Sequence, residues 1–390
     1  MSSIHDLRRL GAFLLLGAVA GAGIRYYVET RARHTRTAPR LIDWQQAQHV
    51  ALRMVQEDNA PALDRAYRTA QYTRLVEQSE PLIADYMGVN LPAPISRVYV
   101  FDRQEWLAAN FASFEKLFAP IEDLYLSQAA NTNGLTMLMR DANSRLMGAQ
   151  VGFLLGFLGR RVLGQYDLSL FSPDPSVRGS LYFIEPNIAR VQQGLGLNDE
   201  DFRLWIALHE TTHVFEFEAY PWVREHFNGL VRQYFDQLNQ QITLLGGVGQ
   251  LLERLVKSIN TGQHWIEIML TPEQRRLFDQ LQALMSVVEG YGNHVMNAIG
   301  KQLLPSFEQI ERRMQERQQH RPILDQIVFR VTGMNLKLVQ YQQGEAFVNA
   351  VVTQRGIAFA GKVWERPEHL PTLDEIRNPA QWIARMERAS

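Results

Sequence analysis

The pentapeptide His209–His213 reads His-Glu-Thr-Thr-His, and these residue types at this spacing suit metal-dependent hydrolysis. Histidines four residues apart lie one turn apart on the same face of a helix, so both can bind one ion. Glu210 is rotated by about 100° from His209, which places its carboxylate beside the ion. There it can take a proton from a water that zinc has activated. We predict that His209 and His213 bind zinc and that Glu210 is the general base.

The helix face that carries the two histidines is otherwise apolar. Phe202, Ile206, His209 and His213 follow one another at steps of four, three and four, so we expect this stripe to point inward. Two buried imidazoles one turn apart need a shared partner, which a metal supplies. Glu216 shares this face one turn further on, where support of a ligand or a surface charge is expected rather than ligation.

A catalytic zinc takes a third protein ligand, and Glu289 is the best candidate. It lies beside a core-facing stripe of a second helix, and a carboxylate among apolar neighbours needs a metal or a paired charge. Gly290 and Gly292 would let this helix approach the histidine helix closely. The alternative is a structural carboxylate that pairs with an arginine.

The residue that stabilises the transition state is harder to choose. Asn293 shares the Glu289 face at four residues' distance. Tyr291 and His294 point elsewhere if the helix is regular, but they would reach the site if the glycines distort it. These three residues are the candidates for substrate contact, with Glu216 as a further supporting residue.

Two capped helices are expected to position these residues. Asn198–Asp201 resembles a capping box that opens a helix to about residue 219. Thr271–Gln274 supplies an N-cap, a proline in the first turn and a glutamine three residues on, which opens a helix to about residue 300. Helical periodicity dominates the chain from Asp43 onward.

Other elements complete a mainly α fold with a minor β component. Residues 97–101 and 180–184 are rich in aromatic and β-branched residues, which predicts two strands. In residues 147–159, glycines recur every four residues, which predicts a tightly packed core helix rather than a membrane span.

Composition excludes several classes of protein. The 390 residues are 46% hydrophobic and 21% charged with a net charge of −1, which is ordinary for a folded protein and gives no indication of nucleic-acid binding. Because cysteine is absent, disulfides, iron–sulfur clusters and thiolate zinc sites are excluded. A metal site must therefore be built from carboxylates and the ten histidines.

The N-terminal 40 residues differ from the rest. Residues 10–24 are uncharged and apolar, and they precede a basic linker. A membrane anchor with the main body in the cytoplasm, a secretory signal peptide, and a buried helix of a soluble protein are the three interpretations. We therefore divide the chain into residues 1–40 and a hydrolase domain of residues 41–390.

Several separated blocks resemble the bacterial zincin-like metallopeptidases often labelled as associated with deazaflavin coenzyme biosynthesis. These blocks include RVLGQYD at residues 161–167, EPNI at 185–188, the HETTH segment and EGY at 289–291. The resemblance covers nearly everything after Asp43. It implies a multi-helical zincin-like hydrolase with His209, His213 and Glu289 as zinc ligands.

The predicted activity is hydrolysis of peptides or small proteins. The strand at residues 180–184 would lie near the active site and pair with extended substrate. Hydrolysis of a non-peptide amide is one alternative. A membrane-tethered scaffold without turnover is another, although retention of Glu210 argues against it.

Overall fold

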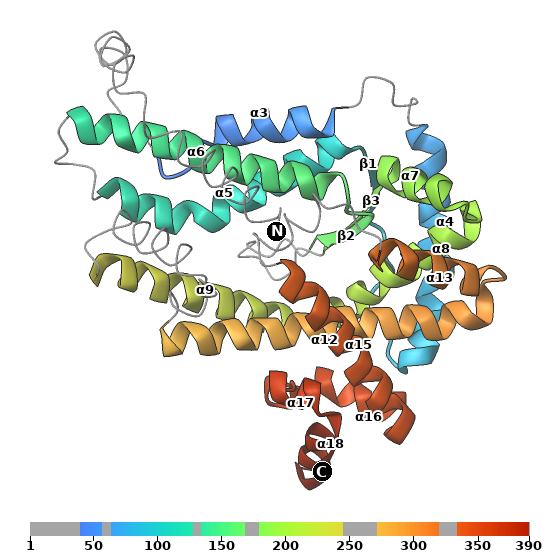
Figure 1. Ribbon diagram of the computed structural model, residues 1–390. Helices are drawn as coiled ribbons and strands as arrows, with labels where there is room; N and C mark the ends of the chain where they lie inside the picture. The colour runs from blue at the N-terminus through green and yellow to red at the C-terminus, as the bar shows by residue number, and fades with distance from the viewer. Residues whose placement is uncertain are drawn as a thin grey trace, which may run out of the picture.

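The computed structural model describes residues 40–56, 64–127, 134–167, 179–244, 271–319 and 334–389 (Figure 1). In these residues the chain is mainly helical with one small sheet, which confirms the predicted fold class. No helix among them is long and apolar enough to cross a bilayer. The predicted anchor at residues 10–24 lies outside the described residues and stays a prediction.

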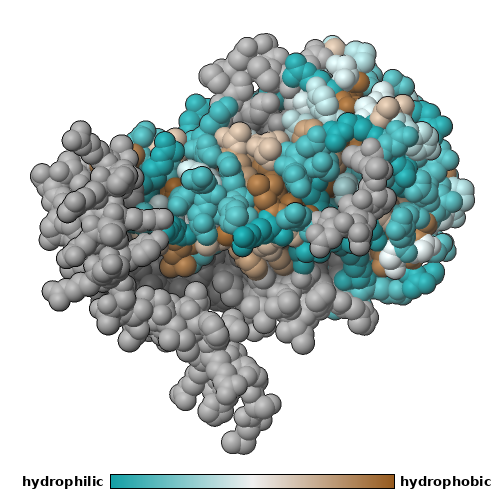
Figure 2. All heavy atoms as spheres, turned by 90° about the horizontal axis from the view of Figure 1, so that it is seen from above, coloured by the Kyte–Doolittle hydropathy of each residue, from teal (hydrophilic) through white to brown (hydrophobic). Residues whose placement is uncertain are grey.

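One layer of the molecule consists of α3 (Trp44–Val55), α5 (Arg103–Ser127) and α6 (Gly134–Gly159), which run across the top of Figure 1. The close contact of α3 with α6 requires glycine, because a Cβ at Gly148 would lie 2.3 Å from the carbonyl oxygen of the α3 N-cap Asp43, and one at Gly152 would lie 2.3 Å from the carbonyl oxygen of Ala47 in α3. The predicted tightly packed glycine helix is thereby confirmed. From above, an apolar area lies within a mostly hydrophilic face (Figure 2). The exposed large hydrophobic side chains of α3 and α6 are Leu52, Leu146 and Phe153.

The sheet has the order β1–β3–β2, from β1 (Val98–Phe101), β2 (Gly164–Asp167) and β3 (Ser180–Ile184). β3 pairs in parallel with β1 and antiparallel with β2, so both of its edges are occupied. The two predicted strands are confirmed, but the prediction that residues 180–184 pair with substrate is wrong. The strand that packs against α8 (Asp199–Val214) is the edge strand β2, which was not predicted.

The larger hydrophobic core lies among the remaining long helices. These helices are α4 (Arg65–Met87), α7 (Glu185–Leu195), α8, α9 (Pro221–Leu244), α12 (Pro272–Leu303), α13 (Phe307–Gln319) and α15 (Met334–Arg355). Buried aromatic and aliphatic side chains from these helices form one continuous cluster, including Tyr72, Phe202, Phe215, Val287 and Val351. The C-terminal elements α16 (Ile357–Ala360), η3 (Gly361–Trp364), η4 (Pro367–His369), α17 (Leu373–Arg377) and α18 (Pro379–Ala389) lie below α12 and α15 (Figure 1).

Local sequence explains where the two functional helices begin. The Asn198 side chain accepts hydrogen bonds from the N–H groups of Glu200 and Asp201, which caps α8. Thr271 and Gln274 form the expected capping box at the start of α12. After Val214 the chain continues as a π-helical turn, η2 (Phe215–Ala219), so the helical path reaches residue 219 as predicted but not as regular α-helix.

Candidate metal centre

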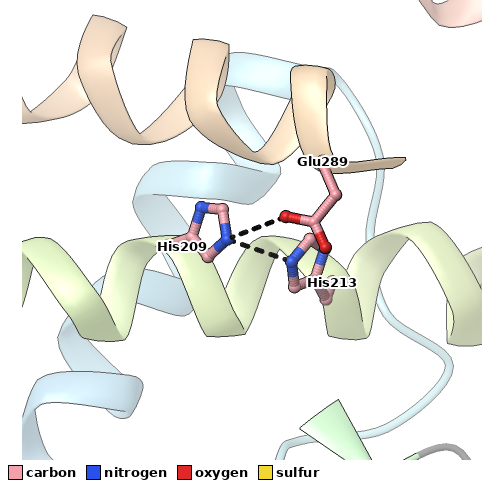
Figure 3. Close-up of side chains that lie close together, drawn as sticks. All are labelled: His209, His213 and Glu289. Atoms are coloured by element: carbon pink, nitrogen blue, oxygen red, sulfur yellow. Dashed lines mark hydrogen bonds and ion pairs between the residues drawn. The ribbon is translucent and has the colours of Figure 1, made fainter. Parts of the chain in front are cut away.

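His209 and His213 on α8 and Glu289 on α12 converge on one point (Figure 3). We call these three residues the metal cluster. The two Nε2 atoms are 3.2 Å apart, and His209 Nε2 lies 3.7 Å from Glu289 Oε2. One donor atom from each residue lies within 4.8 Å of the other two.

The spacing of these donor atoms fits a tetrahedral zinc site. Two ligand atoms at zinc–nitrogen or zinc–oxygen bond distances, set at the tetrahedral angle, lie about 3.3 Å apart. The observed separations of 3.2 and 3.7 Å are close to that value. The metal cluster can therefore hold zinc with only small side-chain movements.

Hydrogen bonding of His213 gives an independent reason for a cation between the histidines. Its Nδ1–H donates to Glu216 Oε2 at 2.6 Å, which leaves its Nε2 to face His209 Nε2 at 3.2 Å. Two imidazole nitrogens this close need a cation between them, either a shared proton or a metal ion. His209 Nδ1 is buried and has no hydrogen-bond partner within the described parts of the chain.

The electrostatic environment of the metal cluster favours positive charge. Burial lowers the pKa of His213, but the carboxylates of Glu216, Glu289 and Glu210 outweigh burial and raise its pKa overall. Burial also raises the pKa of Glu216. The charged side chains that most affect the pKa values of His213 and Glu216 are carboxylates and imidazoles. A divalent cation bound here would compensate the negative charge of the carboxylates.

Glu210 lies beside the metal cluster and is held by the edge strand β2. Glu210 is 7% exposed, and its carboxylate accepts a hydrogen bond from the backbone N–H of Tyr166. A Cβ at Gly164 would lie 2.5 Å from the Glu210 carboxyl group, so the glycine leaves room for this side chain in its observed position. Burial raises the pKa of Glu210 against the opposing effect of the two histidines, which suits a proton acceptor.

The π turn η2 directs two carboxylates to opposite sides of the site. Glu216 is fully buried and bonded to His213, which excludes the surface-charge interpretation. Glu218 accepts hydrogen bonds from the Tyr166 hydroxyl at 3.0 Å and from the Gly179 N–H at 3.2 Å. η2 therefore connects a histidine of the metal cluster to the sheet beside Glu210. Single π turns of this kind are frequent at functional sites.

The predicted substrate-contacting residues divide into two groups. Tyr291 is 1% exposed and packs edge-on against Trp364 in the core. His294 lies between the Tyr86 hydroxyl, 2.7 Å from its Nε2, and Asn349 Oδ1, 2.5 Å from its Nδ1. Both residues therefore have structural partners away from the metal cluster. Asn293 is half-buried on the Glu289 face and remains the predicted substrate contact.

Two glycines of α12 allow close packing against two different helices, α8 and α15. A Cβ at Gly292 would lie 3.0 Å from His213 Cε1 and 3.3 Å from His209 Cε1, so Gly292 leaves space for both imidazoles. A Cβ at Gly290 would instead lie 2.2 Å from the carbonyl carbon of Gly344 on α15. The expected close approach to α8 therefore holds for Gly292, whereas Gly290 serves the crossing with α15.

Sequence reasoning missed three residues that the structure places at or near the site. Tyr166 contributes its backbone N–H, and Glu345 and Asn297 lie where α15 crosses α12, joined by a hydrogen bond of 3.0 Å. The one available signal was Gly344, which precedes Glu345 in a helical segment and indicates close helix packing.

Fold and site together define a mainly helical protein with a candidate metal centre of two histidines and one carboxylate. A family model described as zincin-like metallopeptidase matches residues 42–383, and the chain belongs to this family. A crystal structure from Chloroflexus aurantiacus, described as a candidate hydrolase with a novel fold, shares 57% sequence identity with a TM-score of 0.67. The match covers 89% of this chain and 99% of that one. None of the curated proteins matches the chain significantly.

These comparisons confirm the resemblance to zincin-like metallopeptidases and support a zinc-dependent hydrolase.

Proposed function

We propose that the protein is a zinc peptidase in which His209, His213 and Glu289 hold the metal and Glu210 is the general base. The observation that carries this proposal is the convergence of the metal cluster, with the buried Glu210 carboxylate beside it. Membership of the zincin-like metallopeptidase family supports the same reaction class.

Each step of the reaction has a residue suited to it. Zinc, when bound, would polarise the scissile carbonyl and acidify the attacking water. Glu210 accepts the proton of that water and delivers it to the nitrogen that leaves as the C–N bond breaks. The Tyr166 N–H and the space above Gly164 hold the Glu210 carboxylate in place.

The edge strand β2 favours a peptide as substrate over a small amide. β2 pairs with β3 on one side, and no strand of the described residues pairs with its other edge. An extended peptide can add to such an edge through backbone hydrogen bonds. Because the Tyr166 N–H contacts Glu210, a peptide that lies along β2 would pass next to the base.

Metal content and peptide hydrolysis test the proposal together. We expect about one zinc per wild-type chain and cleavage of a mixed peptide pool. His213→Ala and Glu289→Ala should lose both zinc and activity, whereas Glu210→Gln should keep zinc and lose activity by at least about a hundredfold. Glu200→Gln, an exposed substitution on the same helix, is the control and should change neither quantity.

Three results would contradict the proposal. Wild-type protein that binds no zinc after reconstitution would exclude a zinc hydrolase. Zinc binding without cleavage of any peptide would instead indicate another amide substrate or a scaffold without turnover. Zinc that persists in Glu289→Ala would mean that the third ligand is a different residue.

A further inference from the structure

Glu345 lies where α15 crosses α12, the helix that carries Glu289. Gly290 faces Gly344 at this crossing, and a Cβ at Gly290 would lie 2.6 Å from the backbone nitrogen of Glu345. Because Gly290 follows Glu289, the backbone of Glu345 lies against the turn of α12 that presents the carboxylate ligand. Asn297 Nδ2 donates a hydrogen bond of 3.0 Å to Glu345 Oε1, which fixes the carboxylate along α12.

In the part of the chain that the structure describes, the Glu345 carboxylate has no positively charged side chain as a partner. None of the ion pairs formed among the described residues includes Glu345, and its hydrogen bond comes from a neutral amide. Burial raises the pKa of Glu345, the Asn297 bond opposes this, and His209 lowers the pKa through its charge. The influence of His209 places Glu345 within the electrostatic environment of the metal cluster.

A polar stripe connects Glu345 to the proposed reaction centre. Glu289, Asn293 and Asn297 follow one another at steps of four on α12, so they share one face of that helix. Glu345 faces the far end of this stripe through its bond to Asn297. A substrate held at Glu289 would therefore extend past Asn293 towards Glu345.

When ionised, the Glu345 carboxylate adds a negative charge at the end of this stripe, and no lysine or arginine within the described ranges forms an ion pair with it. A substrate that brings a positive charge near Glu345 would be attracted, and one that brings a carboxylate would be repelled.

We propose that Glu345 determines specificity by accepting a positively charged amine of the substrate at the Asn297 end of this stripe. The inference rests on the proposed peptidase function. The amine can be the free amino terminus of a peptide or the side chain of a lysine, since both present the same ammonium group.

Peptide binding to the full-length Glu210→Gln protein, loaded with zinc, tests this inference without turnover. The probes are a tetrapeptide amide with a free amino terminus, its N-acetylated form, and an N-acetylated form that starts with lysine. We expect at least one amine-bearing probe to bind about tenfold more tightly than the neutral acetylated peptide in calorimetric titrations. The stronger of the two identifies the source of the amine.

The isosteric substitution Glu345→Gln in the same background should abolish this preference and leave zinc content unchanged. Glu311→Gln is the matched control, because Glu311 acts on Glu345 only as a nearby charge, and the preference should persist in it. A preference that survives in Glu345→Gln, or disappears equally in Glu311→Gln, would overturn the proposal. Equal binding of the three probes, or no binding of any, would overturn it too.

Failure of the peptidase function gives a different result from failure of this inference. If the protein binds zinc and prefers amine-bearing probes but the wild type cleaves none of them, only the proposed hydrolysis is wrong. If the wild type cleaves neutral and amine-bearing probes with the same KM, only the role of Glu345 is wrong.

Discussion

Helix α8 carries two buried groups of charged side chains, and they differ in how their charges are balanced. Near its first turn, Arg203 and Asp199 meet Glu185, Tyr72 and Arg68, which we call the Arg203 cluster. Near its last turns lie His209 and His213 of the metal cluster.

The Arg203 cluster is complete without any added group. The Glu185 carboxylate contacts Arg203 at 2.5 Å, accepts a bond from the Tyr72 hydroxyl at 2.8 Å and pairs with Arg68 at 3.1 Å. Arginines thus compensate the buried carboxylate. In the metal cluster, carboxylates and imidazoles face one another, and within the described parts of the chain no arginine or lysine forms an ion pair with Glu210 or Glu216. The comparison indicates that buried charge alone does not distinguish a functional site, whereas buried carboxylates that meet imidazoles instead of arginines favour a metal site.

The largest expected effect is on the free energy of unfolding, which should depend strongly on the Arg203 cluster and only weakly on the metal cluster. Glu185→Ala leaves Arg203 as a buried cation without its main partner and should lower the free energy of unfolding by about 3–5 kcal/mol. Glu289→Ala in zinc-free protein should change it by no more than about 1 kcal/mol, because the Glu289 carboxylate is partly exposed and its interaction with the imidazoles is screened by solvent. Urea denaturation of chelator-treated proteins measures both.

A larger destabilisation by Glu289→Ala than by Glu185→Ala would contradict the proposed difference between the two clusters. Zinc content provides a second measure of this difference. The folded fraction of Glu185→Ala should still bind zinc, whereas Glu289→Ala should not.

A second test moves the base and leaves the metal ligands in place. Alanine at Gly164 would put a methyl group 2.5 Å from the Glu210 carboxyl group, whose flexible end can shift at little cost in stability. We expect Gly164→Ala to keep its zinc and to lose about a hundredfold in kcat, since small displacements of reacting groups have effects of this size. Gly194→Ala is the control, because a Cβ there meets no atom within 4 Å. Loss of zinc in Gly164→Ala would show that β2 supports the ligands as well as the base.

The last prediction concerns the pH dependence of the stability of the zinc-free protein. The Glu216 carboxylate, with Glu289 and Glu210, outweighs burial and raises the pKa of His213 from 6.5 to about 10. A raised pKa in the folded state adds stability below about pH 6.5, and this stability is lost as the pH rises towards about 10. The loss is at most about 1.4 kcal/mol per pH unit for one proton.

Urea midpoints of chelator-treated protein between about pH 6.5 and about pH 9.5 measure this slope. Glu216→Gln should flatten it, because the amide no longer stabilises the imidazolium. Stability of the zinc-free wild type that rises across this range would refute the electrostatic description of the metal cluster. Zinc affinity should rise with pH over the same range, since metal and proton compete for His213.

Local patterns predicted the parts of the site that lie within single helices. The capping residues of α8 and α12 and the apolar stripe below His209 all depend on neighbours a few positions away. Glu289 was found because a carboxylate among apolar residues requires a partner. Its role and those of the histidines stay predictions, although the structure brings the three together.

Features that depend on contacts distant in sequence could not be predicted. The sequence of β2, Gly-Gln-Tyr-Asp, has no apolar alternation, and it becomes a strand because β3 pairs with it. The place of Glu345 follows from the contact of Gly344 with Gly290, which no local pattern specifies. Tyr291 and His294 were candidates because of their proximity in sequence to Glu289, yet their partners lie on other elements.

The π turn η2 also sets the angular phase of everything that follows it. Each residue of an α-helix advances the direction of its side chain by about 100°, and a π turn holds one residue more than an α turn. Deletion of one residue between Phe215 and Ala219 would restore a regular helix, but it would turn by about that angle the direction in which the chain leaves the helix at Tyr220. Tyr220 has non-helical backbone angles and leads directly into α9, which buries Val223 and Leu230 in the core. The extra residue therefore sets the direction from which the chain enters α9.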